Sequence, residues 1–378
     1  MSLLSRNRSA PAVDLDAVHA ALASVEDPEL RMPLPDAGMV GDVELGKSGL
    51  VRITVRLTTA TCPMKDRLVT DVTEAVRTVA GVSRVEVTLG TMSESDRLQL
   101  AGRLRGSRAE GTHQFGDGSA TNVYAVASGK GGVGKSSVTA NLSVALAQQG
   151  QRVGVLDADV WGYSIPQLFG VRRSPVALKG VMLPVEAHGV SLMSVGFFVE
   201  EEQPVVWRGP MLHKAIAQFL TDVHWGELDT LLLDLPPGTG DVTMTLLELL
   251  PDAQLLAVTT PQLAAQTVAA RVGRMARDAR MPVAGVIENM SGLVCGSCDE
   301  RTAIFGEGGG ARLAATIDTP LLGQIPLDLP LRTSGDQGVP AMVAAPTAAS
   351  VVEIRRIAQE LPVVRRSLVG RRLPLSVI

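Results

Sequence analysis

The sequence predicts an α/β protein in which a mostly parallel sheet carries helices on both faces, preceded by a small α+β domain. From residue 122 onward, short apolar runs alternate with stretches that can form helices. These runs are continuously apolar, as expected of strands that are buried on both faces of a parallel sheet. The predicted strands lie within residues 123–128, 152–159, 190–196, 230–237, 253–260, 283–290 and 320–327.

A different pattern occupies the first part of the chain. Residues 13–25 space their apolar side chains for a helix, with Asp14 as its N-cap. Residues 41–58 alternate around a central Lys-Ser-Gly turn, as a β-hairpin does, and residues 82–90 favour another strand. A second helix is expected between them, after a Cys-Pro pair. We therefore predict an α+β domain over residues 11–98.

The domain boundaries follow from composition. A chain of 378 residues favours two domains. Residues 99–120 mix Gly, Ser and Arg without an apolar period, which predicts a linker. The α/β domain is then expected over residues 121–365, followed by a basic tail at 366–378.

Composition also narrows the compartment and the partners. The net charge is −4 and aromatic residues make up 3% of the chain, which disfavours a nucleic-acid-binding surface. Three cysteines are too few for a disulfide framework and suit a reducing compartment. The first residues lack the apolar region of a secretion signal, and no apolar run approaches the length of a membrane span. A cytoplasmic protein without stable membrane association is expected.

A phosphate-binding loop is the most specific motif. Gly129, four residues, then Gly134, Lys135 and Ser136 stand between a predicted strand and a predicted helix, as in a P-loop. Its glycines let backbone N–H groups face phosphate oxygens at the helix N-terminus. Lys135 would contact the β- and γ-phosphates of ATP, and the Ser136 hydroxyl would ligate Mg²⁺. The predicted nucleotide-binding residues here are Gly129, Lys130, Gly131, Gly132, Val133, Gly134, Lys135, Ser136 and Ser137.

Acidic side chains follow two other predicted strands. Asp157 and Asp159 come at the end of one strand, and Asp234 ends another. In open α/β sheets ligands bind beyond the carboxyl ends of the strands, so these carboxylates are expected beside the P-loop. Asp234 is a Walker-B-like carboxylate, and Asp157 and Asp234 are predicted to hold Mg²⁺ with Ser136. Taken alone, Asp159 would equally suit a helix N-cap.

A pair of cysteines follows the strand predicted at 283–290. Cys295 and Cys298 stand three positions apart, so one chain supplies two thiolates. A symmetric dimer would supply four, which suits a [4Fe–4S] cluster or a tetrahedral zinc ion. The two cysteines could instead be unrelated buried thiols without a functional role. A redox dithiol is disfavoured, because no thioredoxin-like unit is evident in the sequence.

Several motifs together resemble a known family. The run "KGGVGK" at 130–135 resembles the deviant P-loop of MinD-like ATPases. The motifs at 205–241, 258–262, 286–298 and 304–314 resemble the Mrp/ApbC iron–sulfur cluster carrier ATPases, so the resemblance spans about residues 121 to 345. The front segment, with "DPEL" and "TTATCPMKD", is similar to the PaaD-like domain that often precedes such ATPases.

The resemblance assigns roles to single residues. Lys130 matches the signature lysine that reaches the nucleotide of the partner subunit, and Asp159 matches the aspartate that orients the attacking water. Lys130, Lys135 and Asp159 are therefore the catalytic candidates. Asn289 matches the asparagine that contacts adenine. Gly296 replaces a proline that the family often carries between its two cysteines.

The resemblance implies a homodimeric ATPase that binds ATP, Mg²⁺ and a [4Fe–4S] cluster. It would pass the cluster to apo iron–sulfur proteins, in contact with the cluster assembly machinery. Two other functions stay open: a positioning ATPase on a membrane or DNA, favoured by the arginine-rich C-terminal segment, and an ATPase dimer bridged by structural zinc. Cys62 has two interpretations, a transient cluster ligand or a small buried residue.

Overall fold

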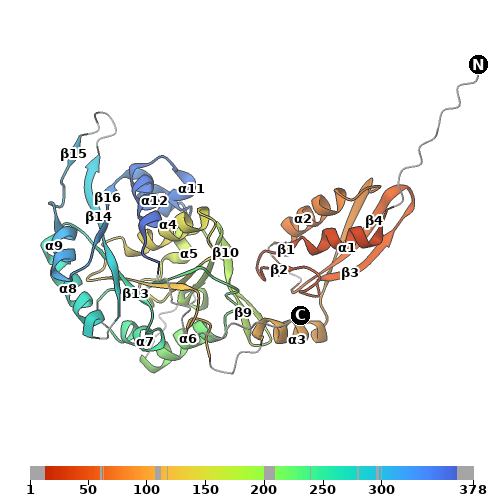
Figure 1. Ribbon diagram of the computed structural model, residues 1–378, viewed down its shortest axis with the longest axis horizontal. Helices are drawn as coiled ribbons and strands as arrows, with labels where there is room; N and C mark the ends of the chain where they lie inside the picture. Colours follow the sequence, from red (N-terminus) through yellow and green to blue (C-terminus); the bar gives the residue numbers. More distant parts are fainter. Residues whose placement is uncertain are drawn as a thin grey trace, which may run out of the picture. The chain divides into compact units, whose positions relative to one another are not determined.

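The structure is a computed structural model that describes residues 13–59, 62, 64–106, 112–116, 118–199, 209–238, 240–278, 281–294, 298 and 300–363. It divides into two compact units (Figure 1). Unit 1 is formed by Met1–Arg108 together with Val176–Leu183, and unit 2 by the remainder of the chain.

Unit 1 has the α+β architecture that its sequence predicts. A three-stranded sheet has the order β3-β4-β5, in which β3 and β4 form the predicted hairpin and β5 lies parallel to β4. Asp14 caps the first helix by accepting a hydrogen bond from the Asp16 amide, as predicted. The elements are α1 (Leu15–Ala23), β1 (Glu26–Asp27), β2 (Met32–Pro33), β3 (Val40–Leu45), β4 (Leu50–Leu57), α2 (Lys65–Arg77), β5 (Arg84–Thr91) and α3 (Glu94–Arg105).

Helix α3 differs from the predicted linker at 99–120, because the helix continues to Arg105. A capping box between Ser93 and Asp96 fixes its start, and Gly106 follows its last turn. Leu100 and Leu104 are buried one turn apart, whereas most of the other side chains are polar. Such a narrow apolar stripe among arginines hides the helical period in the sequence.

Unit 1 also takes in a hairpin from the middle of the chain, which the predicted boundaries placed in the α/β domain. Strands β8 (Val176–Leu178) and β9 (Val181–Leu183) pair antiparallel, and Leu178, Val181 and Leu183 belong to the same hydrophobic core as α1 and α2. The turn residues Lys179 and Gly180 both have positive φ, as a tight hairpin turn requires. Arg105 of α3 donates a hydrogen bond of 2.8 Å to the Lys179 carbonyl.

Unit 2 is built on a mixed sheet with the order β10-β11-β7-β12-β6-β13-β14, in which β14 also pairs with β15 and β16. Only the β10–β11 and β14–β15 pairs are antiparallel among its described strands. The strands are β6 (Asn122–Ser128), β7 (Val153–Asp157), β10 (Val185–Ala187), β11 (Val190–Ser194), β12 (Thr230–Asp234), β13 (Gln254–Thr259), β14 (Val283–Val294), β15 (Arg301–Thr302) and β16 (Leu321–Leu327). All seven predicted strands are present.

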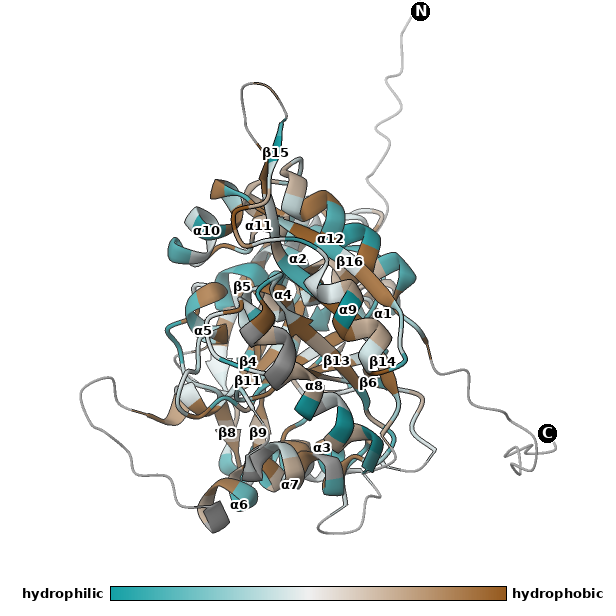
Figure 2. Ribbon diagram, turned by 90° about the vertical axis from the view of Figure 1, so that its left-hand side faces the viewer, coloured by the Kyte–Doolittle hydropathy of each residue, from teal (hydrophilic) through white to brown (hydrophobic). Residues whose placement is uncertain are grey.

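Helices cover both faces of this sheet, which confirms the predicted fold class. Helices α4 and α12 pack together on one face, and α8 and α9 lie on the other (Figure 1). Figure 2 shows hydrophobic residues along the central strands, with hydrophilic residues on parts of the covering helices. The helices are α4 (Lys135–Gln148), α5 (Ile165–Leu168), α6 (Gly209–Thr221), α7 (Asp241–Leu249), α8 (Leu263–Asp278), α9 (Gly309–Thr316), α10 (Leu329–Asp336), α11 (Ala341–Ala344) and α12 (Ala349–Glu360).

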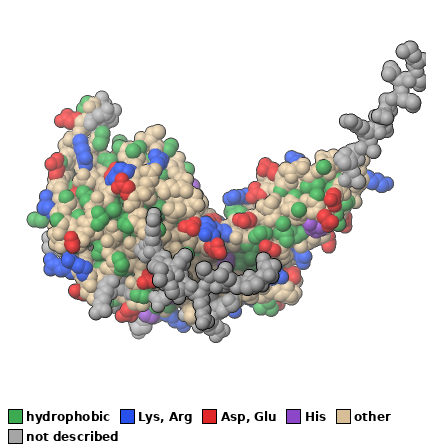
Figure 3. Space-filling view, in the orientation of Figure 1, with side chains coloured by type: hydrophobic (Ala, Val, Ile, Leu, Met, Phe, Trp, Pro, Cys, Tyr) green, Lys and Arg blue, Asp and Glu red, His purple; other side chains and the backbone are tan. Residues whose placement is uncertain are grey.

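Within the described part of the chain, none of these helices combines the length and apolar character needed to cross a membrane. On the face shown in Figure 3, acidic and basic side chains are interspersed over unit 2.

Candidate nucleotide site and cysteine turn

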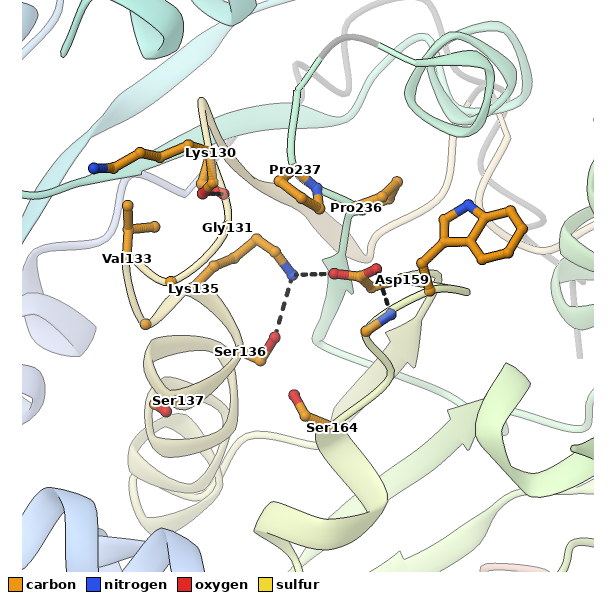
Figure 4. Close-up of a pocket in the computed structure, with 15 residues that line it drawn as sticks. Lys130, Gly131, Val133, Lys135, Ser136, Ser137, Asp159, Ser164, Pro236 and Pro237 are labelled. Carbon is orange, nitrogen blue, oxygen red and sulfur yellow. Dashed lines mark hydrogen bonds and ion pairs between the residues drawn. The ribbon is translucent and has the colours of Figure 1, made fainter. Parts of the chain in front are cut away.

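A pocket of about 530 Å³ lies at the carboxyl ends of β6, β7 and β12 (Figure 4). Its volume falls in the range of roughly 300–1,000 Å³ that is typical of small-molecule sites. The loop between β6 and α4 forms one wall, and the residues after β7 and β12 form the others. The lining residues are Ser128, Lys130, Gly131, Gly132, Val133, Gly134, Lys135, Ser136, Ser137, Asp159, Trp161, Gly162, Ser164, Pro236 and Pro237.

The backbone of the loop leaves room for an anion. Gly132 and Gly134 both have φ of +79°, a conformation that favours glycine. A Cβ atom added at Gly131 or Gly132 would meet no protein atom within 4 Å, so open space lies over this backbone. Since α4 begins at Lys135, the loop presents a helix N-terminus to that space. This arrangement fits the phosphates of a nucleotide.

Lys135 lies among carboxylates on the floor of the pocket. Its ammonium nitrogen is 2.7 Å from Asp234 Oδ2 and 3.7 Å from Asp159 Oδ2. The Ser136 hydroxyl donates a 2.6 Å hydrogen bond to Asp234 Oδ2. Lys135 is only 6% exposed and Asp234 is fully buried, so little solvent screens these charges. A hydroxyl next to a carboxylate is a hard oxygen donor set that fits Mg²⁺, which usually takes one or two carboxylates and substrate phosphates.

Thr139, which was not predicted from the sequence as a site residue, also contacts this carboxylate. Its hydroxyl lies 2.7 Å from Asp234 Oδ1 and 3.0 Å from the Lys135 carbonyl. Thr139 is fully buried on α4, one turn after Lys135. The spacing of four residues places both side chains on one face of the helix, and this was the available signal. Thr139 therefore orients Asp234 from the side opposite to Ser136.

Asp157 lies behind the pocket and does not line it. Its carboxylate accepts hydrogen bonds from the Asp159 and Ile165 amides and from the Ser194 hydroxyl. Burial raises the pKa of Asp157 to about 8, and the neighbouring Asp234 carboxylate adds to the rise. Burial likewise raises the pKa of Asp159, whereas Lys135 opposes this. A divalent cation accompanying the nucleotide would counter this rise, because a nearby positive charge favours the ionised carboxylates.

The second lysine of the loop points away from Lys135 (Figure 4). Lys130 Nζ donates a 3.0 Å hydrogen bond to Gln262 Oε1, at the start of α8. Trp161, on the loop after β7, lines the mouth of the pocket and is 71% exposed. Neither Gln262 nor Trp161 had a role predicted from the sequence.

Asn289 supports the loop in this structure. Its side-chain amide donates a 2.9 Å hydrogen bond to the Val133 carbonyl, and the residue is buried. A Cβ atom at Gly134 would lie 2.3 Å from the Asn289 amide nitrogen, so a side chain there would displace Asn289 from its contact with Val133. Asn289 is not among the lining residues, and neither are Asp157, Asp234 and Gly129. Its contact with adenine stays a prediction.

The cysteine pair lies between β14 and β15, in the segment 295–300 that we name the cysteine turn. Cys298 is described and exposed, whereas Cys295 and Gly296 lie outside the described residues. In Figure 1 the ends of β14 and β15 project beyond the neighbouring elements of unit 2. Strands β14 and β15 pair antiparallel through Leu293 with Thr302 and Val294 with Arg301. In the described part of the chain, no three His, Cys, Asp or Glu side chains gather as a metal site.

Cys62 lies in a different environment. It is 4% exposed and belongs to the hydrophobic core of unit 1. Such burial favours the interpretation of Cys62 as a packed side chain over that of a cluster ligand.

Two families match this chain. The family described as "NUBPL iron-transfer P-loop NTPase" matches residues 119–362, and the family described as "Iron-sulfur cluster assembly protein" matches residues 15–89. These two matches cover the parts of the chain that carry the nucleotide pocket and the front sheet.

Two relatives match nearly the whole length of this chain, and a solved structure matches part of it. The iron-sulfur cluster carrier protein of Mycobacterium tuberculosis is 48% identical over 367 residues, covering 95% of this chain and 96% of the relative. That of Synechocystis is 40% identical and covers 92% and 96%. A nucleotide-binding protein from Archaeoglobus fulgidus, solved in complex with ADP, is 39% identical, with a TM-score of 0.52 over 58% of this chain and 87% of that chain.

Proposed function

The chain belongs to the NUBPL-type family of iron-transfer P-loop NTPases, and we propose that it is an ATP-dependent carrier that holds a [4Fe–4S] cluster between two copies of itself and delivers it to apoproteins. The proposal rests mainly on strand β14. This strand contacts the P-loop through Asn289 and ends at the cysteine turn. A nucleotide in the pocket and the thiolates would therefore be connected through one element of the sheet.

The cysteine turn explains the need for two copies. Each chain supplies Cys295 and Cys298, whereas a [4Fe–4S] cluster takes four thiolates. A two-fold axis beside the turn doubles the set, because an isologous interface brings the same surface of each copy together. The exposure of Cys298 supports this, since a thiol that must meet a partner has to be accessible.

ATP hydrolysis is assigned to the pocket. Lys135 would leave Asp234 and contact the phosphates, while Ser136 and Asp234 hold Mg²⁺ at the place where their oxygens now meet. Asp159, at the opposite wall, is within reach to orient the attacking water. Lys130, held by Gln262 in one chain, is the cation assigned to the nucleotide of the partner copy.

Anaerobic reconstitution tests the proposal. We expect the wild type to form a dimer with about four iron atoms and as many sulfides per dimer. Replacing Cys295 and Cys298 together with serine should abolish this content and leave ATP hydrolysis in place. Cys62→Ala is the matched control and should retain the iron, because Cys62 lies in the core of unit 1. Equal iron content in the double serine variant would rule the carrier function out.

The same experiment distinguishes a zinc-bridged dimer from a cluster-bridged one. Zinc also takes four thiolates but brings no sulfide and no visible colour. A colourless dimer that holds about one zinc per two chains, under the same anaerobic conditions, would contradict the cluster and support a structural metal.

A positioning ATPase has less support. Arg356 pairs within α12 with Glu353 at 2.7 Å and with Glu360 at 2.6 Å, so its charge is neutralised locally. Arg365 and the predicted tail residues Arg366, Arg371 and Arg372 lie outside the described residues. ATP-dependent sedimentation with anionic liposomes, or retention on DNA, is the result that would favour this function instead.

A further inference from the structure

Strand β14 changes direction between the nucleotide pocket and the cysteine turn. Its pairing with β16 shifts register between Asn289 and Leu293. Within this interval Met290 has φ of +56° and Gly292 has φ of +141°, values outside the ordinary strand region. A strand that twists in this way is re-aimed locally, as at a β-bulge. The segment 290–294 therefore joins two sites through an irregular, strained piece of backbone.

The upstream end of this segment is fastened to the P-loop. The Asn289 amide donates to the Val133 carbonyl at 2.9 Å, and both residues are buried. The adjacent Gly134 approaches Asn289 so closely that a Cβ atom there would lie 2.3 Å from the Asn289 amide nitrogen and displace it. A displacement of the P-loop backbone on nucleotide binding would thus act directly on β14.

The downstream end is fastened by Arg301. One guanidinium nitrogen of Arg301 donates to both the carbonyl and the hydroxyl of Ser291, each at 2.7 Å. Arg301 also pairs with Val294 across the β14–β15 ladder. A Cβ atom at Gly292 would lie 2.8 Å from Arg301 Nε, so the guanidinium lies against the backbone of the twisted segment. Hydrogen bonds from a charged donor are stronger than neutral ones.

We propose that Arg301 is a positioning residue that couples the P-loop to the cysteine turn. It ties residue 291, two positions after the P-loop contact, to residue 301, three positions after Cys298. A shift of Asn289 is then passed across the base of the turn and changes the accessibility of the Cys298 thiol. The inference rests on the proposed function for its purpose, since nucleotide-controlled thiols are what a cluster carrier needs.

The test measures Cys298 alkylation in iron-free protein, so that it is independent of cluster binding. A Cys295→Ser background leaves one thiol in the turn, and mass spectrometry follows its reaction with iodoacetamide with and without Mg·ATP. We expect the nucleotide to change the rate by about fivefold, the lower end of ordinary site-to-site couplings. In Arg301→Ala this ratio should fall to about one, with ATP affinity unchanged.

Three further variants sharpen the result. Ser291→Ala removes one of the two acceptors of Arg301 and should give an intermediate ratio. Arg301→Lys keeps the charge but loses the planar guanidinium, so it should restore only part of the effect. Arg274→Ala, at an exposed position of α8, is the matched control and should behave as wild type. Should Arg301→Ala misfold, Ser291→Ala carries the test.

The outcomes are distinct. A wild-type ratio of one, or an Arg301→Ala ratio equal to the wild type, would overturn the coupling and leave the carrier function standing. Absence of iron and sulfide in the reconstituted wild type would instead remove the carrier function, while a nucleotide-dependent Cys298 rate would still support the coupling.

Discussion

The nucleotide pocket and the cysteine turn lie on the same sheet, but one chain builds them to different degrees. In the pocket, Lys135, Asp234 and Thr139 are buried and linked by short hydrogen bonds and ion pairs. At the cysteine turn, Cys298 is exposed and the flanking strand β15 has two residues. The difference teaches that a buried charge network is organised within one chain, whereas the proposed two-thiolate site would take half its ligands from a partner copy.

Lys135→Ala should have the largest effect on the pocket, lowering both ATP hydrolysis and stability, without affecting the cysteine turn. Its loss removes the cation that contacts Asp234 and Asp159, and a buried charge left without its partner costs about 3–5 kcal/mol. The phosphates lose their positive contact as well, so ATP hydrolysis should fall by at least about a hundredfold. Phosphate release with Mg·ATP measures the rate, and thermal unfolding measures the stability.

The iron content of Lys135→Ala, unlike its ATP hydrolysis, should not change. The cysteine turn does not contact Lys135 in the described residues, so iron retention after reconstitution should stay at the wild-type level. Lys214→Ala, at an exposed position of α6, is the control for removing a lysine and should change neither quantity. If Lys135→Ala lost its iron while remaining folded, the two regions would not be separable.

Thr139→Val should have a smaller effect confined to the pocket. The variant keeps the shape but removes a hydroxyl that lies 2.7 Å from Asp234 Oδ1. A buried acceptor that loses such a partner costs about 1–3 kcal/mol, so the unfolding free energy or the hydrolysis rate should drop accordingly. Thr243→Val is the matched control, because the buried Thr243 hydroxyl has no hydrogen-bond partner among the described residues. That control should be neutral or stabilising.

The pH dependence of stability comes from the same buried network. The pKa of Asp157 is about 8 in the folded protein and 3.8 in its ordinary state, so between these values the folded form holds a proton that the unfolded chain has lost. The free energy of unfolding must therefore fall as pH rises through this window, by up to about 1.4 kcal/mol per pH unit. In Asp157→Asn this contribution is absent.

Unfolding midpoints of the wild type and Asp157→Asn between pH 5 and 8 test this sign. The wild type should lose stability relative to the variant as pH increases. A difference that stays constant over the window would mean that Asp157 ionises normally. The raised pKa of Asp159 comes from burial and from Asp234, which both proteins share, so Asp159 should not disturb the comparison.

Sequence reasoning recovered the sheet and the P-loop because their signals are local. Apolar runs such as that of β12 indicate a strand buried on both faces of the sheet, and the glycine spacing indicates the conformation of the P-loop. Contacts between distant residues left no such signal. Asn289 meets Val133 from 156 residues away, and Leu178 enters the core of unit 1 from a hairpin beyond the P-loop. Helix α3 was missed because two buried leucines carry its period among charged residues.

Cys298→Ser should have the smallest effect on stability, and this completes the comparison. An exposed side chain on a short turn leaves little to lose, and surface substitutions usually stay within about 0.5 kcal/mol. The unfolding midpoint of iron-free Cys298→Ser should therefore match the wild type, while Thr139→Val lies clearly below both. The comparison uses iron-free protein because a bound cluster would stabilise the wild type by mass action. A loss as large as that of Thr139→Val would mean that the thiol is already packed within one chain, and the argument for a second copy at the turn would lose its basis.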